Sequence, residues 1–149
     1  MPLDSDTAQL KMTAEEVTCY LDEVFPQRHL SGPPVHIEAL RPYGATMRMT
    51  FEERFLRPGG TISGPAMFML ADIGLYVAVL GMIGPVGLAV TTNLGINFLR
   101  RPKQCDMIGE VELIKLGRRL AVGEVSLFSE GESALAAHAT GTYSIPPDR

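Results

Sequence analysis

The chain has 149 residues, of which 46% are hydrophobic and 20% are charged, a balance typical of a folded globular protein and unlike that of a disordered one. This length allows one domain with its own hydrophobic core, so we expect a single domain over residues 1–149, with residues 1–12 as a flexible tail. The net charge of −4 argues against a general nucleic-acid-binding protein, which usually presents a basic face.

The two cysteines, Cys19 and Cys105, have no neighbouring histidines and no CxxC spacing. They exclude a cysteine-rich zinc site and a disulfide framework. Two reduced thiols are the simpler interpretation, and a single bridge stays open as the alternative. The polar, acidic N-terminus MPLDSDTAQL lacks the blocks of a signal peptide, so we expect a cytoplasmic protein.

The first half of the chain predicts a short amphipathic helix followed by a β-hairpin. Thr13 and Glu16 form a capping box, apolar residues then recur at helical spacing, and Pro26 ends the helix. Residues 35–41 are predicted as a strand. After a turn, residues 45–52 alternate between apolar and polar side chains, as a strand with one buried face does.

A long turn over residues 57–65 leads into a predicted helix from about Gly64 to Met82 that is apolar almost all round. Such a helix must be enclosed on most sides. Residues 66–90 also resemble a membrane span in hydrophobicity, but Asp72 lies inside this run and a carboxylate in lipid is expensive. A helix buried in a soluble protein is therefore preferred to a membrane helix.

The second half of the chain is predicted as four strands, which cover residues 90–99, 106–116, 119–128 and 133–145. The full order predicts an α+β fold in which an antiparallel sheet of about six strands wraps around one long central helix. One small sheet cannot cover a helix that is apolar on most sides. We therefore expect a homo-oligomer to supply the remaining cover.

Asp72 is the most informative residue, because it is the only charged residue between Pro58 and Leu99. An unpaired carboxylate is costly to bury, and its ionised form is disfavoured by desolvation. A carboxylate kept in such surroundings indicates a functional role. The alternatives are an aspartate on the helix surface and an ion pair at a subunit interface.

The start of the same helix offers a second functional group. Its first amides lack intrahelical acceptors and carry the positive end of the helix dipole, so they could stabilise an oxyanion. Gly64 is the best candidate donor, because Pro65 has no N–H. Asp72 lies about 12 Å further along the axis, which is too far for both groups to touch one reaction centre. An antiparallel helix from a two-fold partner would bring Asp72 beside the partner's Gly64, which predicts a site shared between subunits.

These residues resemble the hotdog-fold thioesterases of the phenylacetate-degradation type. The family hallmark is a His-Gly-Gly turn that opens the central helix, with a catalytic Asp nine residues after the His. Ser63-Gly64-Pro65 stands in the place of this turn, and Asp72 falls at the matching distance. After the helix, the family continues with a Thr or Ser, an alternating strand and a Pro. Residues 91–99 and Pro102 match this order. The resemblance extends from Arg57 to Ser144.

The resemblance implies hydrolysis of acyl-CoA by a dimer or a dimer of dimers. Asp72 would act as general base on water, or as nucleophile through a short-lived anhydride. The Gly64 amide would polarise the thioester carbonyl, and Thr91 would position the water. Ser63 replaces the family His, and Arg57 or a neighbour replaces the usual Asn. Ser63 can still donate a hydrogen bond, although with a shorter reach, so turnover could be slower or the substrate class different.

The phosphates of coenzyme A, here part of the substrate, call for cations. Two basic clusters could supply them: Arg100, Arg101 and Lys103 after a strand, and Lys115, Arg118 and Arg119 around a hairpin. For each residue alone, an ordinary solvated charge is the alternative. We expect no other cofactor and no metal, because the three histidines, His29, His36 and His138, are scattered without a second ligand at metal spacing.

Two other functions stay open besides a membrane protein. A hotdog hydratase would pair an acid with a catalytic His, but the sequence has no His between His36 and His138. A non-catalytic acyl-CoA-binding or regulatory domain is the other alternative. It is favoured by the two differences from the family pattern, at Ser63 and Arg57. The sequence leaves the acyl group undetermined.

Overall fold

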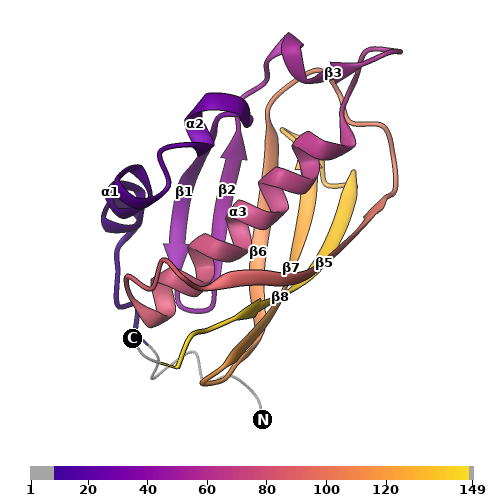
Figure 1. Ribbon diagram of the computed structural model, residues 1–149. Helices are drawn as coiled ribbons and strands as arrows, with labels where there is room; N and C mark the ends of the chain where they lie inside the picture. Colours follow the sequence, from indigo (N-terminus) through magenta and orange to yellow (C-terminus); the bar gives the residue numbers. More distant parts are fainter. Residues whose placement is uncertain (1–8, 148–149) are drawn as a thin grey trace.

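The capping box and the alternating strand of the first half form as predicted in the computed structural model, which describes residues 9–147 (Figure 1). Helix α1 (Ala14–Val24) begins after Thr13, whose hydroxyl accepts from the Glu16 amide while the Glu16 carboxylate accepts from the Thr13 amide. Strands β1 (Val35–Arg41) and β2 (Gly44–Met49) form an antiparallel hairpin. A short helix α2 (Arg28–Ser31), which was not predicted, joins α1 to this hairpin.

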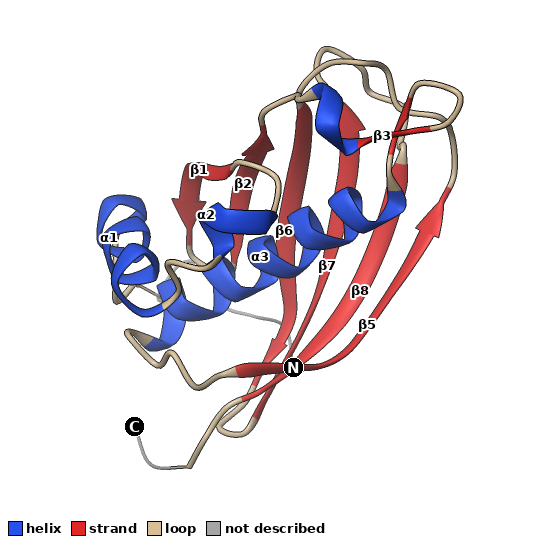
Figure 2. Ribbon diagram, turned by 45° about the horizontal axis from the view of Figure 1, so that its top comes forward, coloured by secondary structure: helices blue, strands red, loops and turns tan. Residues whose placement is uncertain are grey.

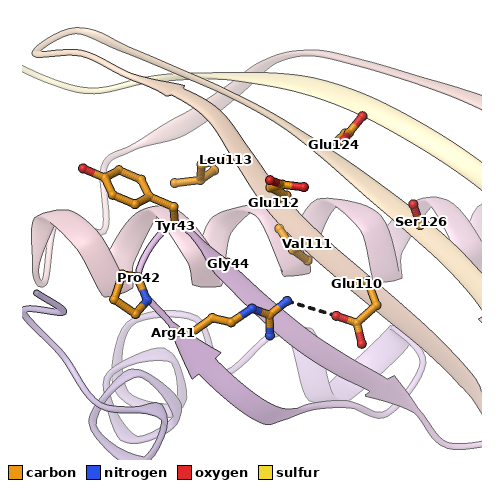
Figure 3. Close-up of a pocket in the computed structure, with 10 residues that line it drawn as sticks. All are labelled: Arg41, Pro42, Tyr43, Gly44, Glu110, Val111, Glu112, Leu113, Glu124 and Ser126. Carbon is orange, nitrogen blue, oxygen red and sulfur yellow. Dashed lines mark hydrogen bonds and ion pairs between the residues drawn. The ribbon is translucent and has the colours of Figure 1, made fainter. Parts of the chain in front are cut away.

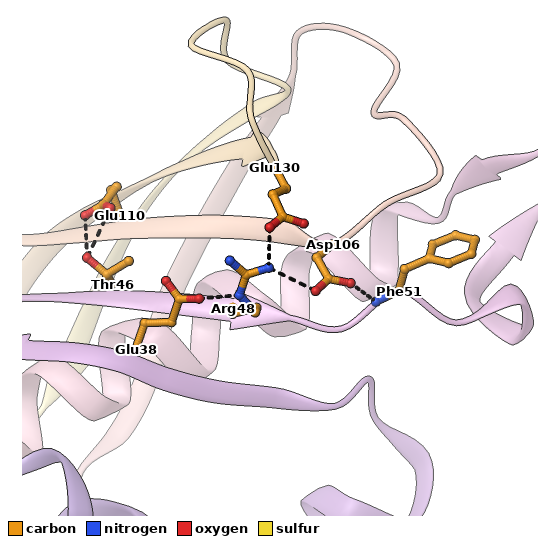
Figure 4. Close-up of polar contacts among 7 residues, drawn as sticks. All are labelled: Glu38, Thr46, Arg48, Phe51, Asp106, Glu110 and Glu130. Atoms are coloured by element: carbon orange, nitrogen blue, oxygen red, sulfur yellow. Dashed lines mark hydrogen bonds and ion pairs between the residues drawn. The ribbon is translucent and has the colours of Figure 1, made fainter.

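Strand β2 ends at Met49, short of the predicted residue 52. The Phe51 amide donates to the Asp106 carboxylate at 2.7 Å instead of continuing the ladder, and this contact lowers the pKa of the Asp106 carboxyl. The Arg48 guanidinium holds the same region together through ion pairs with three carboxylates (Figure 4), those of Glu38, Asp106 and Glu130.

The predicted long turn of residues 57–65 contains structure of its own. A 3₁₀ turn, η1 (Glu53–Phe55), leads into a small hairpin of β3 (Leu56–Arg57) and β4 (Thr61–Ile62). This hairpin delivers the chain to the start of the central helix.

The second half contains the central helix and four strands: α3 (Gly64–Ile83), β5 (Val90–Phe98), β6 (Met107–Leu116), β7 (Leu120–Ser129) and β8 (Ala137–Ser144). The six-stranded sheet has the order β1-β2-β6-β7-β8-β5, with every neighbouring pair antiparallel. The helices lie on one face of the sheet, with α3 running across it and α1 beside β1 (Figure 2). The predicted α+β hotdog fold is confirmed.

Close packing of α3 on the sheet depends on small residues in the strands beneath it. A Cβ atom placed on Gly123 of β7 or on Gly141 of β8 would lie 2.7 Å from a Leu75 methyl group. Real side chains do not approach so closely, so these positions let the helix approach the sheet.

One stripe of α3 is left uncovered by the sheet, although the helix was expected to be enclosed on most sides. Its members are exposed or half-buried: Pro65, Phe68, Met69, Asp72 and Tyr76. The neighbouring edge strand β5 also exposes apolar side chains, among them Val90 and Phe98. By length and composition α3 could also cross a membrane, but most of the helix is buried within this fold. A single chain thus leaves an apolar surface along α3 and β5.

The N-terminal segment and the cysteines can be compared with expectation only in part. Residues 1–8 of the expected tail lie outside the described residues. Residues just before α1 are held against the end of α3, where Met12 is buried and the Lys11 amide donates to the Gly81 carbonyl at 2.7 Å. Cys19 and Cys105 are both free thiols, which confirms the simpler interpretation.

Candidate active site

Asp72 is held by two hydroxyl groups from different strands. The Thr91 hydroxyl, at the start of β5, donates to Asp72 Oδ1 at 2.6 Å. The Tyr143 hydroxyl, near the end of β8, donates to the same oxygen at 2.8 Å and to the Asp72 carbonyl at 3.0 Å. Along the sequence no cation lies within a helical turn or two of Asp72, whereas the fold supplies two hydrogen-bond donors to its carboxylate. The carboxylate is thus fixed in orientation as well as solvated.

The second carboxylate oxygen, Asp72 Oδ2, accepts no hydrogen bond from residues 9–147. Asp72 itself is half-buried and lies on the uncovered stripe of α3. One oxygen is therefore held in place while the other remains able to take a proton or to attack a carbonyl carbon. This division of roles suits a general base or a nucleophile.

Tyr143 remains a proton donor because of its environment. Burial raises the pKa of its hydroxyl, and the negative charge of Asp72 raises it further. Its ring stacks on that of Tyr76 with centroids 5.8 Å apart, and the Tyr76 hydroxyl donates to the Gly87 carbonyl at 2.7 Å. The sequence patterns did not single out Tyr143, because only the fold brings it to Asp72, 71 positions earlier in the chain.

A hollow of about 290 Å³ opens beside Asp72. Its walls are mostly apolar and come from α1, α2, α3, the start of β5 with the residues just before it, and β8. Among the lining residues are Leu21, Phe25, Arg28, Met69, Asp72, Ile73, Tyr76 and Tyr143. Such a hollow can hold an apolar group next to a carboxylate.

The start of α3 lies in a second hollow of about 570 Å³. The Ser63 hydroxyl caps the helix by accepting from the Ala66 amide at 3.4 Å, which leaves its own proton able to be donated. The Gly64 amide has no acceptor among the described residues. Arg57, Arg100 and Arg101 line the same hollow as Gly64, and the Arg100 Nε–H donates to the Leu135 carbonyl at 3.1 Å. Asp72 does not line it.

With the site's geometry in view, residues 59–136, more than half of the chain, match the family model described as "Thioesterase superfamily". The chain belongs to the thioesterase superfamily. A relative in Saccharolobus solfataricus, named as a candidate esterase, is 32% identical over 111 residues, which cover 74% of this chain and 73% of the relative.

Solved structures agree with this assignment to the thioesterase superfamily. A crystal structure of a candidate thioesterase from Silicibacter sp. TM1040 is 48% identical, with a TM-score of 0.85 over 95% of this chain and 97% of that one. The Escherichia coli PaaI protein from the phenylacetic acid degradation operon is 17% identical, with a TM-score of 0.76 over 89% and 93% of the two chains. The latter shows the shared fold. The predicted resemblance to the hotdog-fold thioesterases of the phenylacetate-degradation type is confirmed.

The fold of this thioesterase-superfamily chain separates the basic residues that were predicted to bind phosphate. Arg100 and Arg101 follow the end of β5, whereas Arg118 and Arg119 lie in the β6–β7 hairpin, level with the start of β5. Within one chain the two groups do not meet. Lys103 forms an ion pair with Glu132 at 2.7 Å, so its charge is already partly compensated.

A third hollow, of about 530 Å³, lies on the other face of the sheet and contains none of the predicted site residues (Figure 3). Its floor includes the Arg41–Glu110 ion pair and two further glutamates, Glu112 and Glu124. His138 also lies on that face, 3.2 Å from Glu124, so it cannot serve as a partner of Asp72. Within residues 9–147 no three His, Cys, Asp or Glu side chains are grouped to hold a metal ion.

Proposed function

We propose that this protein is an acyl-CoA thioesterase that hydrolyses the thioester to free acid and CoA, at sites shared between the two subunits of a homodimer. Membership of the thioesterase superfamily supports thioester hydrolysis in general. The observation that carries the specific proposal is the Asp72 carboxylate, which is anchored through Oδ1 and left open at Oδ2 beside an apolar hollow.

The hydrolysis proceeds by attack of water on the thioester carbonyl. Asp72 Oδ2 takes a proton from this water as the new C–O bond forms. The C–S bond then breaks, and the departing thiolate of CoA receives the proton that Asp72 had taken, which restores the carboxylate. Thr91 and Tyr143 keep the carboxylate oriented throughout. In the alternative route Oδ2 attacks the carbonyl directly and expels the CoA thiolate, and water then hydrolyses the resulting anhydride to the free acid and the Asp72 carboxylate.

The negative charge on the carbonyl oxygen is stabilised from the second subunit. The Gly64 amide at the start of α3 points along the helix dipole and is free to donate to an oxyanion. Gly64 and Asp72 of one chain lie about 12 Å apart along the helix axis, so one chain alone cannot complete the site. A two-fold axis beside α3 and β5 brings the two groups together.

The exposed apolar surface along α3 and β5 is the proposed dimer interface. Phe68, Val90 and Phe98 expose between 39% and 54% of their surface in the single chain. Pairing about a two-fold axis removes these side chains from water, which favours association. It also sets the Asp72 hollow of one subunit beside the partner's Gly64 hollow.

The two hollows then divide the substrate between them. The acyl group occupies the largely apolar hollow at Asp72. CoA extends through the hollow at Gly64, where Arg57, Arg100 and Arg101 contact its phosphates. This proposal retains Arg100 and Arg101 from the sequence prediction and adds Arg57.

Release of free thiol from a panel of short, long and aromatic acyl-CoAs tests the enzyme, with Asp72→Asn as the decisive variant. The change keeps the shape of the side chain but removes its basicity, so we expect kcat to fall about 10²- to 10⁴-fold with the dimer intact. Glu23→Gln, on the exposed part of α1, is the matched control and should retain activity. Binding of acyl-CoA without turnover by the native protein would favour the non-catalytic alternative.

A further inference from the structure

Arg28 is a buried cation in the wall of the Asp72 hollow. Only 9% of its side-chain surface is exposed, although Arg28 belongs to a helix of four residues on the protein surface. It lines the same hollow as Asp72, Met69 and Tyr76. None of the sequence patterns singled out this residue, and the proposed hydrolysis does not use it.

The guanidinium has more donors than the described residues satisfy. Of its five N–H groups, one from Nη2 donates to Asp22 Oδ1 at 2.5 Å. Its Nε–H is buried and has no acceptor among residues 9–147. Nη1 also has no acceptor among these residues and is not enclosed as Nε is, so the guanidinium keeps N–H groups that an oxygen carried into the hollow by a ligand can accept.

The charges around Arg28 decide which kind of acceptor fits. A hydrogen bond from His29 and the charge of Arg28 lower the pKa of the Asp22 carboxyl, so Asp22 is ionised at neutral pH and already balances the guanidinium. Asp72 adds a second carboxylate to the walls of the hollow. A further carboxylate on the ligand would be repelled, whereas a neutral oxygen can accept the unused N–H without this cost.

We propose that Arg28 is a specificity-determining residue, which donates a hydrogen bond to a neutral oxygen carried by the acyl group at a distance from the thioester. This inference rests on the proposed thioesterase function. The preferred substrates are acyl-CoAs whose acyl chain bears a hydroxyl or carbonyl oxygen beyond the reacting carbonyl. A site with an unpaired buried donor discriminates strongly against an analogue that lacks the acceptor.

Matched acyl-CoA series test the inference. Butyryl-, hexanoyl- and octanoyl-CoA are each compared with the corresponding ω-hydroxyacyl-CoA and with the ω-carboxyacyl-CoA. For at least one chain length, kcat/KM for the hydroxylated substrate should exceed that for each of its two analogues by about tenfold, the value of one hydrogen bond to a charged donor.

Two variants assign this preference to Arg28. In Arg28→Met the ratio of kcat/KM between hydroxylated and unsubstituted substrates should fall to about one, since the variant keeps length but has no donor. In Arg28→Lys, which keeps the charge and loses the planar fork, the ratio should fall part of the way. Gln27→Met, the same kind of change at the exposed neighbouring position, should keep the full ratio.

Equal kcat/KM for hydroxylated and unsubstituted substrates at every chain length in the native protein would overturn the inference, even if both variants failed to fold. A preference that survives in a folded Arg28→Met or Arg28→Lys protein would do the same. Both outcomes leave the thioesterase proposal standing. Absence of thiol release from every acyl-CoA would instead remove the thioesterase proposal itself.

Discussion

Asp72 shows how a single residue can combine two requirements that conflict in a simple apolar pocket. A general base must be ionised and close to an apolar substrate group, yet burial disfavours the charged form of a carboxylate. Here Thr91 and Tyr143 both donate to Oδ1, and the carboxylate remains half-buried. One carboxylate oxygen is thus held by two hydrogen-bond donors, while the other accepts none from residues 9–147.

Tyr143 should couple the stability of the protein to alkaline pH. The pKa of its hydroxyl is raised in the folded state by burial and by Asp72, from a value of about 10 in the unfolded chain. A group with a raised folded pKa contributes its full stabilisation below the unfolded pKa. That stabilisation is lost as the pH rises above about 10, by at most about 1.4 kcal/mol per pH unit.

The comparison of wild type with Tyr143→Phe isolates this contribution. At neutral pH the variant should be less stable by about 1–3 kcal/mol, because a hydrogen bond to a charged group is lost. In urea unfolding from about pH 8 to about pH 11, this difference should shrink as the pH passes the unfolded pKa. A difference that stays constant over the whole range would show that the Tyr143 proton is not held as the structure indicates.

The residues of the site differ in how visible they are in the sequence. Asp72 stands out because no other charge occurs in a long apolar run, and Gly64 because it opens the predicted helix before a proline. Tyr143 bonds to a residue 71 positions away, and alternation along a strand predicts only which face it occupies. Arg28 lies in a helix too short to show any periodicity. Contacts that depend on how the helix is rotated over the sheet are not encoded in local patterns.

At the scale of elements, the sequence predicts those helices and strands that are long enough for a hydrophobic pattern to repeat within them. α1, α3 and the six strands of the main sheet have enough length for a period or an alternation to emerge. The elements η1, β3 and β4 have two or three residues each, which is too few for a period or an alternation to emerge. The premature end of β2 has a tertiary origin, because the carboxylate that accepts from the Phe51 amide belongs to Asp106, 55 positions away.

The start of α3 makes a prediction of its own. Gly64→Pro removes the amide proposed to stabilise the oxyanion, at a helix position that tolerates proline. Gly64→Ala keeps the amide, and both changes place a Cβ about 3.1 Å from the Phe98 ring. The two variants should therefore share any packing effect. We expect kcat of Gly64→Pro to lie about 10²- to 10³-fold below that of Gly64→Ala.

Similar kcat values for Gly64→Ala and Gly64→Pro in acyl-CoA hydrolysis would argue that the carbonyl oxygen is held by another donor. The Ser63 hydroxyl is then the nearest candidate, since it caps the helix as an acceptor and keeps its own proton. Thermal unfolding of both variants checks that the helix start is preserved.

At the scale of the whole molecule, the two hollows that the proposed site combines lie apart in a single chain. Asp72 and its hollow lie on one part of α3, while Gly64, Arg57, Arg100 and Arg101 surround the other hollow. The uncovered apolar stripe of α3 runs between them and continues onto β5. In the proposed dimer, the apolar surface that a single chain exposes is also the surface that brings the two hollows together, so the proposal links oligomerisation to activity.

Mixed dimers test this link directly. When Asp72→Asn and Gly64→Pro subunits carry different affinity tags, the heterodimer can be purified away from both homodimers. In a shared arrangement, one of its sites combines the wild-type Asp72 of one subunit with the wild-type Gly64 of the other, and the second site carries both changes. The heterodimer should recover about half of the wild-type kcat per dimer, although both parent homodimers are almost inactive. A heterodimer of Asp72→Asn with Asp72→Ala has no intact site and should remain inactive. If each chain used its own Asp72 and Gly64, the first heterodimer would be as inactive as its parents, and the two hollows would not belong to one reaction.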